Sequence, residues 1–141
     1  MSDINAISSP CISQNLAHEV LKLVLAQAVK RGVSVAAAVV DQSACLVSFI
    51  RMDRVSPIMN EVAVRKAASA SAFGYPTGWM PDELTGPLIA ATANRITNLP
   101  GGLPLRVEGA VAGGLGVSGS TAEIDDEIAR AAASELGLEI A

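Results

Sequence analysis

At 141 residues the chain has the size of one domain, and we expect residues 1–141 to form a single domain. Hydrophobic residues make up 50 % of the chain and charged ones only 17 %, so part of the surplus apolar surface is expected at an interface between copies of the chain. The net charge of −4, with ten scattered basic residues, argues against nucleic acid as a partner.

No segment of the sequence predicts a membrane span. The longest apolar run, Val35 to Val40, has the length of a strand. The first residues have neither the basic start nor the apolar core of a signal peptide, so we expect a soluble cytoplasmic protein with no membrane partner. Cys11 and Cys45 have no metal-like spacing, and both are expected to be free thiols.

The first expected element is a long helix. Ser9 and Pro10 are typical of a helix start, and Gly32 fits a left-handed end after about Arg31. The main apolar stripe comprises Leu16, Val20, Leu23 and Val24, and a second, roughly opposite stripe comprises His18, Leu21 and Leu25. A helix that is apolar on two sides lies between two surfaces, one of which could be a partner subunit or a ligand.

Two strands follow the helix. Residues 33–40 are rich in Val and Ala without polar alternation, which predicts a strand covered on both faces. The segment from Asp41 to Ala44 supplies turn residues, and residues 45–52 return as a second strand. We therefore expect a β-hairpin.

The middle of the chain predicts two helices. Ser56-Pro57 opens the first, which ends near Phe73. Asp82 is the expected cap of the second, a short helix over about 83–93. The residues of the first that are expected to face inward are Ile58, Val62, Ala63, Ala67 and Ala70.

The last third predicts a loop, a hairpin and a helix. Residues 100–104 are the loop, and residues 107–117 form the hairpin with its turn near Glu108-Gly109. Ser120 to Glu123 fits the capping box of a last helix that ends near Leu136. The predicted fold is therefore α+β, an antiparallel sheet with packed helices in the order α-β-β-α-α-β-β-α.

The glycines of this region allow several interpretations. Residues 114–119 match G-x-G-x-x-G, but only 22 residues remain after Gly119, too few for the rest of a dinucleotide-binding fold. We interpret Gly113, Gly114 and Gly116 as packing positions beneath the last helix. Residues 100–104 form either a concavity of backbone N–H groups for an anion such as a carboxylate, or a tight loop stiffened by two prolines.

Few residues are candidates for chemistry. His18, the only histidine, is either a partly buried polar residue or an axial ligand to a flat apolar cofactor. Without a close carboxylate pair, the sequence predicts no other metal-ligand set. Several charges beside apolar elements form either a structural ion-pair network or a polar cluster that binds a carboxylate or tunes an acid–base group. They are Arg51, Asp53, Arg65, Lys66, Arg106 and Glu108.

A set of short motifs occurs in a characteristic order. The set comprises Val39-Val40-Asp41, Phe49-Ile50-Arg51-Met52-Asp53, Lys66-Ala67, Phe73 to Thr77, Gly101-Gly102-Leu103-Pro104 and Gly116-Val117-Ser118-Gly119. In order and spacing these motifs resemble the GlcG/HbpS family, the haem-binding or haem-degrading domain that also occurs as the carboxy-terminal domain of PduO-type proteins. The resemblance covers about residues 12–137.

The resemblance implies a profilin-like sandwich that assembles into dimers or octamers, with haem binding or haem-linked redox sensing in some members. Haem-binding relatives place a ligand histidine in the first helix, which implies His18 as the haem iron ligand. Gly101, Gly102 and Leu103 would line the adjoining pocket. Ala44 and Arg54 stand where the family usually has glycine.

Three functions are open at this point. The first is a cytoplasmic homo-oligomer that binds haem or, since Arg54 and Ile124 would change the pocket mouth, a similar planar ligand. The second is a cofactor-independent isomerase, lyase or hydrolase that acts on a small oxygenated or carboxylate metabolite, with the glycine loop holding an oxyanion. Its catalytic groups would be Arg51, Asp53, Arg65, Lys66 and Glu108. The third is a structural or accessory oligomer, which predicts that no pocket of ligand size exists.

Overall fold

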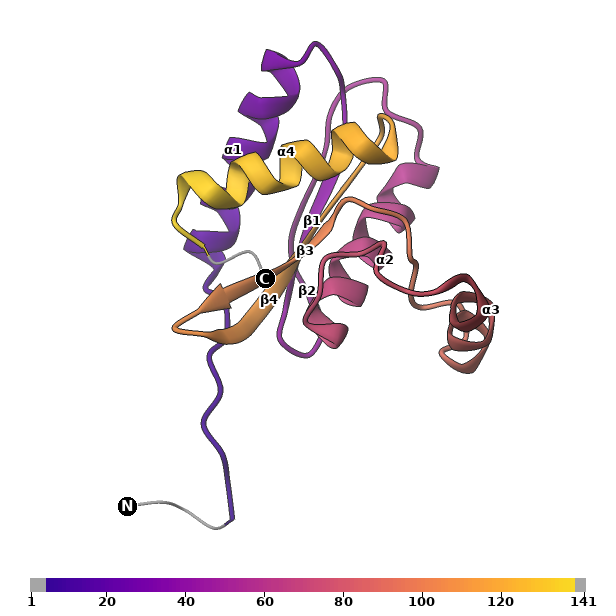
Figure 1. Ribbon diagram of the computed structural model, residues 1–141. Coiled ribbons are helices and arrows are strands. Elements are labelled where there is room, and N and C mark those ends of the chain that lie inside the picture. The colour runs from indigo at the N-terminus through magenta and orange to yellow at the C-terminus, as the bar shows by residue number, and fades with distance from the viewer. Residues whose placement is uncertain (1–4, 139–141) are drawn as a thin grey trace.

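A computed structural model describes residues 5–138, which form four helices and four strands (Figure 1). The elements are α1 (Gln14–Lys30), β1 (Ala36–Asp41), β2 (Leu46–Arg51), α2 (Ile58–Phe73), α3 (Asp82–Ala91), β3 (Gly102–Val107), β4 (Ala110–Ser118) and α4 (Ala122–Glu135). The structure confirms the expected α+β class and the order α-β-β-α-α-β-β-α.

The four strands form one antiparallel sheet in the order β2-β1-β4-β3, and helices cover both of its faces (Figure 1). In β1, the odd-numbered Ala37 and Val39 pack with α1 and α4, whereas the even-numbered Ala38 and Val40 pack under α2. Successive side chains of a strand point to opposite faces. The unbroken apolar run of this strand therefore follows from its burial on both sides, as expected.

Two glycines of β4 allow α2 to lie directly on the sheet. A Cβ atom on Gly114 would overlap the carbonyl oxygen of Ala67, and one on Gly116 would overlap the carbonyl oxygen of Ala63. The prediction named the wrong helix: these glycines lie beneath α2 and not beneath the last helix. A strand needs glycine where another backbone comes this close.

Residues 102–105 form the start of β3 instead of the expected loop. Gly102 pairs with Gly116 and Pro104 with Gly114. A proline is tolerated there because β3 lies at the edge of the sheet, where one side of the strand needs no ladder hydrogen bonds. The Gly102 N–H donates to Thr77 Oγ1 at 2.8 Å and is therefore committed within the chain. The two interpretations of residues 100–104 as a concavity or a tight loop both missed this strand.

Helix α1 begins later than expected. The hydroxyl of Ser13, not that of Ser9, accepts the capping hydrogen bond, from Leu16 N at 3.1 Å. The preceding described residues form no helix, and Ile12 N donates to Ala112 O at 2.9 Å, which holds this segment to β4. The end agrees with the prediction, because the helix stops at Lys30 and Gly32 adopts a left-handed φ of +69°.

Helix α2 has the expected bounds, but Ile58, which was expected to face inward, points to solvent. Ala63, Ala67 and Ala70 are buried as expected, whereas Ile58 is 65 % exposed. Ile58 lies five positions before Ala63, about 140° around the helix, and so points away from the sheet. The helix ends before Gly74, whose φ of +74° fits a left-handed cap.

The caps of the last two helices also differ from the prediction. In α3, Asp82 is the first helical residue, Pro81 occupies the cap position, and no side chain caps the helix. In α4 the cap is Thr121, whose hydroxyl accepts from Ile124 N at 3.2 Å. The sequence predicted a capping box from Ser120 to Glu123. In the structure the acceptor for Ser120 N is Asp125 Oδ1, at 3.0 Å.

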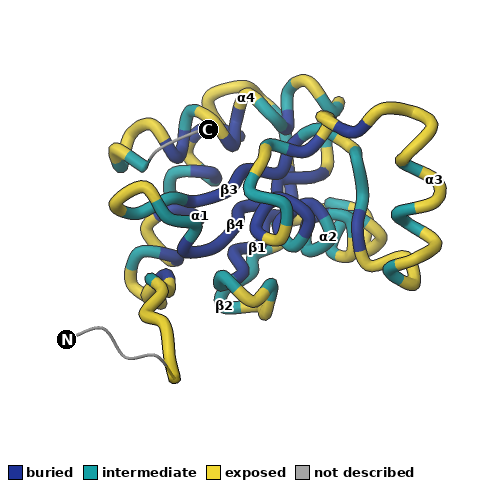
Figure 2. The backbone as a smooth tube through the Cα atoms, turned by 60° about the horizontal axis from the view of Figure 1, so that its bottom comes forward, coloured by how far each residue is buried: buried dark blue, intermediate teal, exposed yellow. Residues whose placement is uncertain are grey.

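Helix α3 stands away from the sheet and buries none of its residues, as Figure 2 shows. Within residues 5–138, no helix is both long and apolar enough to cross a membrane. Cys11 and Cys45 are exposed free thiols, as predicted.

Candidate functional site

Lys66 and Asp125 form a buried ion pair that joins α2 to α4. Lys66 Nζ lies 3.1 Å from Asp125 Oδ2, and both side chains are only 3 % exposed. The ammonium also donates to the carbonyl oxygen of Val117 at 2.8 Å, and the second oxygen of Asp125 accepts from Ser120 N. Each charge is therefore paired and hydrogen-bonded, the arrangement in which buried charges are tolerated.

The environment of the pair lowers the pKa of Lys66 from its ordinary value of 10.5. Removal of the ammonium from water is the largest cause, and the attraction and hydrogen bond of Asp125 oppose it only in part. Lys66 is only 2 % exposed, and through this pair it holds α2 to α4.

The backbone at Gly101 and Gly102 is enclosed by the same contacts. A Cβ atom on Gly101 would lie 2.6 Å from Val117 O and 2.8 Å from Lys66 Nζ, and one on Gly102 would overlap Lys66 O. Leu103 is fully buried. Packing within the chain explains why positions 101 and 102 are glycine.

His18 is exposed in the second turn of α1. No other described residue exchanges a hydrogen bond with its imidazole, which leaves both ring nitrogens accessible. The expected second apolar stripe is only partly present, because Leu21 is buried in the core while Leu25 is half-buried. The outer side of the helix is nevertheless partly apolar, since Val29 is 70 % exposed.

The five residues of the enzyme hypothesis do not converge on one cavity. Arg51 at the end of β2, Asp53 just after it and Glu108 in the β3–β4 turn are all exposed. None of them lines the groove on the outer side of α2 or the hollow beside Arg54 and Ser120. Arg65 lines this groove, whereas Lys66 is buried on the inner side of α2.

The charges form no extended ion-pair network either. Arg106 donates to the carbonyl oxygen of Gly74 at 2.8 Å, and Arg65 donates to that of Asn94. Of the six charges, Lys66 alone forms an ion pair within the described residues, and its partner Asp125 was not among the predicted site residues. No local pattern indicates a pair 59 residues apart.

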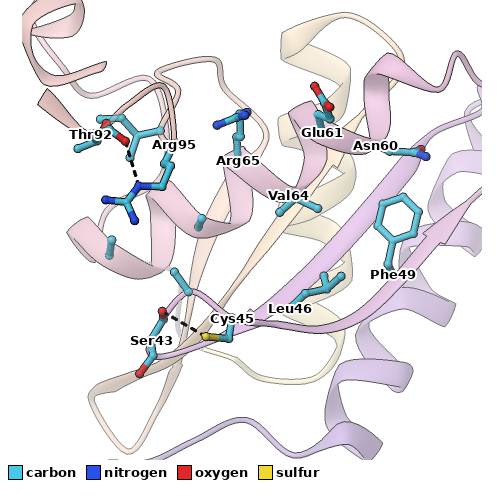
Figure 3. A pocket seen from close by; sticks show the side chains of 14 residues that line it. Ser43, Cys45, Leu46, Phe49, Asn60, Glu61, Val64, Arg65, Thr92 and Arg95 are labelled. Atoms are coloured by element: carbon cyan, nitrogen blue, oxygen red, sulfur yellow. Dashed lines mark hydrogen bonds between the residues drawn. The ribbon is translucent and has the colours of Figure 1, made fainter. Parts of the chain in front are cut away.

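The described chain has a groove of about 840 Å³. It runs along the outer side of α2, between the β1–β2 turn and the end of α3 (Figure 3). Its lining comprises Ser43, Ala44, Cys45, Leu46, Phe49, Asn60, Glu61, Val64, Arg65, Ala68, Ala72, Thr92, Arg95 and Ile96. The volume is within the range of small-molecule sites, so the structure contradicts the hypothesis that predicted no pocket of ligand size.

Of the residues that line this groove, only Arg65 was predicted from the sequence as a site residue. The signal that could have revealed more is the spacing of Glu61, Val64, Arg65, Ala68 and Ala72, which share one side of α2 opposite its buried alanines. Small residues on an outward side leave room above the helix.

Within residues 5–138, no cluster of three or more His, Cys, Asp or Glu residues could hold a metal ion.

Two turn residues take a backbone conformation that favours glycine. Ala44 has a φ of +63° and Arg54 a φ of +67°. L-residues adopt this left-handed region only at a cost. These are the two positions where the resemblance described above implies glycine.

Comparisons with known proteins agree with the fold. The family model for haem-degrading protein HbpS-like matches residues 12–134. Protein GlcG of Escherichia coli K12 is 34 % identical over 108 residues, which cover 76 % of this chain and 81 % of GlcG.

Two solved structures superpose closely on this chain. The PduOC–haem complex has a TM-score of 0.84 and 25 % identity, and the match covers 92 % of this chain and 97 % of that one. HbpS of Streptomyces reticuli, solved as a double mutant, has a TM-score of 0.85 and 28 % identity, with 97 % and 94 % of the two chains covered. The chain therefore belongs to the HbpS-like family.

Proposed function

We propose that this protein binds haem or a similar planar ligand on the outer side of α1, with His18 as the axial ligand. The observation that carries the proposal is the exposure of the only histidine, with no described hydrogen-bond partner, on a partly apolar helix surface. A relative of the same fold has been solved as a complex with haem, which supports this class of ligand. Haem supplies an iron that accepts imidazole nitrogen as an axial ligand.

The outer side of α1 has the spacing that a flat ligand needs. Residues 18, 22, 25 and 29 follow one another at intervals of three or four, so His18, Lys22, Leu25 and Val29 share one side of the helix. Leu25 and Val29 would contact the apolar macrocycle. Lys22 is exposed and pairs with Glu19 on the surface, and it could exchange that partner for a carboxylate of the ligand.

A single helix side covers only one face of a macrocycle. Small-ligand sites in proteins enclose most of the ligand surface, so this site is incomplete in one chain. We therefore propose that a second copy of the chain covers the other face and that ligand binding promotes self-association. The exposed apolar side chains of the described residues, Val29 among them, fit such an interface.

Titration of the purified protein with haemin tests the proposal. We expect saturable binding with a Soret band typical of imidazole ligation, and we expect His18→Ala to lose that band. Added imidazole should restore the spectrum of His18→Ala, because it can enter the space left by the side chain. Lys30→Gln, which removes an exposed charge elsewhere on α1, is the matched control and should bind as the wild type does. Identical spectra for the wild type and His18→Ala would contradict the role of His18.

A further inference from the structure

The groove along α2 lies on the opposite side of the sheet from α1 and is not used by the proposed haem site. We propose that this groove binds a small organic anion with an apolar body, an aromatic or branched carboxylate. Three features of the lining support this ligand class: an apolar floor, a cationic end, and a single acid at the other end.

The floor and one wall of the groove are apolar. Leu46 and Phe49 of β2 lie close to Val64 of α2, as Figure 3 shows. Leu46 is 54 % exposed, and Ala68 and Ala72 leave open space along the helix beside it. Apolar surface left open to water favours a ligand that covers it.

The end of the groove near α3 carries two arginines. Arg95 Nε donates to Thr92 O at 3.0 Å, and Arg65 donates through Nη1 to Asn94 O. Each guanidinium is thus held by one hydrogen bond to the end of α3. No other side-chain hydrogen bond of either guanidinium occurs within residues 5–138, so most of the five donors on each remain available. A planar array of free donors fits a carboxylate, which it can bind through two parallel hydrogen bonds.

The charges that line the groove favour an anionic ligand and determine how it is oriented. Glu61 is the only acid of the lining and lies in the first turn of α2. Arg65 follows it by one turn, but its guanidinium reaches the carbonyl oxygen of Asn94, in the segment after α3 that also carries Arg95. The lining therefore has a net charge of +1 within a chain of net charge −4. An anionic group is attracted to the arginine end and repelled from the Glu61 end, which directs the apolar body toward Phe49.

The chain contains its own reporter for this site. Cys45 lines the groove and is exposed, and Cys11 is an exposed thiol that lies outside the lining. A ligand in the groove should slow alkylation of Cys45 by iodoacetamide and leave the rate at Cys11 unchanged. At a ligand concentration of about ten times Kd, about one tenth of the sites are free, so alkylation of Cys45 should slow about tenfold.

The probe is 2-naphthoate, with neutral 2-naphthamide as the control of the same shape. We expect 2-naphthoate to protect Cys45 and 2-naphthamide to protect it much less. Arg95→Gln should weaken protection about tenfold, as expected for the loss of a charge-assisted hydrogen bond. Ala72→Trp fills the groove from an exposed helix position and should abolish protection, whereas Lys30→Gln should leave it unchanged.

Three outcomes would overturn the proposal. One is unchanged alkylation of Cys45 with 2-naphthoate at millimolar concentration. Another is equal slowing at Cys11, which would indicate non-specific binding. The third is protection of Cys45 that Arg95→Gln leaves intact. His18→Ala should retain full protection, so failure of the haem proposal and failure of the groove proposal are distinguishable.

Discussion

Replacement of Lys66 by methionine removes one partner of the buried ion pair and keeps most of the side-chain volume. Asp125 then retains its hydrogen bond from Ser120 N but loses the ammonium 3.1 Å away. The uncompensated carboxylate remains buried beneath α4. We expect this substitution to destabilise the fold strongly.

Two arguments give the magnitude of the loss. Removal of one member of a buried ion pair typically costs about 3–5 kcal/mol. A buried unpaired carboxylate can instead take up a proton, and for a carboxyl group of ordinary pKa, about 3.9, that costs about 4 kcal/mol at pH 7. The expected loss at pH 7 is therefore about 3–4 kcal/mol. It should shrink by up to about 1.4 kcal/mol for each unit by which the pH is lowered, because protonation becomes easier.

The chain offers a matched control for this substitution. Lys22 Nζ lies 3.1 Å from Glu19 Oε1, the same separation as in the buried pair, but the side chain of Lys22 is 70 % exposed. An exposed pair contributes about 0–1 kcal/mol, so Lys22→Met should change the unfolding free energy little. The double variant Lys66→Met/Asp125→Asn should lose clearly less than the sum of its two single variants, because neither charge is then left alone.

Urea denaturation followed by circular dichroism measures these differences. All variants should be compared at one protein concentration, since self-association would raise apparent stability. A loss below about 1 kcal/mol for Lys66→Met would show that the charge of Lys66 does not compensate a buried carboxylate, because a buried pair should produce a larger loss. So would a loss equal to that of Lys22→Met.

Three further predictions concern the fold. Burial holds the pKa of Lys66 below 10.5, so the folded chain releases that proton at lower pH than the unfolded chain. The unfolding free energy of the wild type should therefore rise relative to that of Lys66→Met as the pH is raised toward 10.5. A difference in unfolding free energy that stays the same at all pH values would contradict this. Gly116→Ala should lower the free energy of unfolding by about 3 kcal/mol or more, because its Cβ would overlap Ala63 O. Thermal denaturation measures the loss, and an unchanged melting temperature would show that α2 lies further from β4. Ala44→Gly should stabilise the chain by about 1 kcal/mol through relief of the left-handed φ of +63°, and a loss of stability in urea would disprove that strain.

Local chemistry explains the parts of the fold that the sequence predicted well. Gly32 and Gly74 ended their helices as expected, and Glu108-Gly109 formed the turn of the second hairpin. These features depend on a few neighbouring residues with special backbone preferences, which a sequence displays directly. The unbroken Val and Ala run of β1 likewise indicated burial on both faces.

Contacts between distant segments explain what was missed. Residues 102–105 lack β-branched and aromatic residues and contain proline, yet they form a strand because β4 pairs with them. Ser9-Pro10 has the chemistry of a helix start, but the pairing of Ile12 with Ala112 overrides it. In each case the deciding partner lies elsewhere in the chain.

The candidate sites follow the same division. Exposure of His18 could not be read from helical spacing, because its stripe also contains the buried Leu21. The groove requires three segments, around Cys45, Val64 and Arg95, whose proximity depends on the packed fold. The family resemblance suggested the class of ligand that we propose, and the structure shows which of the predicted residues are exposed.

Hydrogen–deuterium exchange with and without haemin tests the location of the proposed haem site most directly. Three peptides are decisive: residues 16–30 of α1, residues 60–73 of α2, and residues 99–105 around Gly101. We expect haemin to slow exchange in residues 16–30 and to leave the other two peptides unchanged, and we expect His18→Ala to remove the effect. Slowed exchange in residues 60–73 or 99–105, with residues 16–30 unaffected, would contradict it.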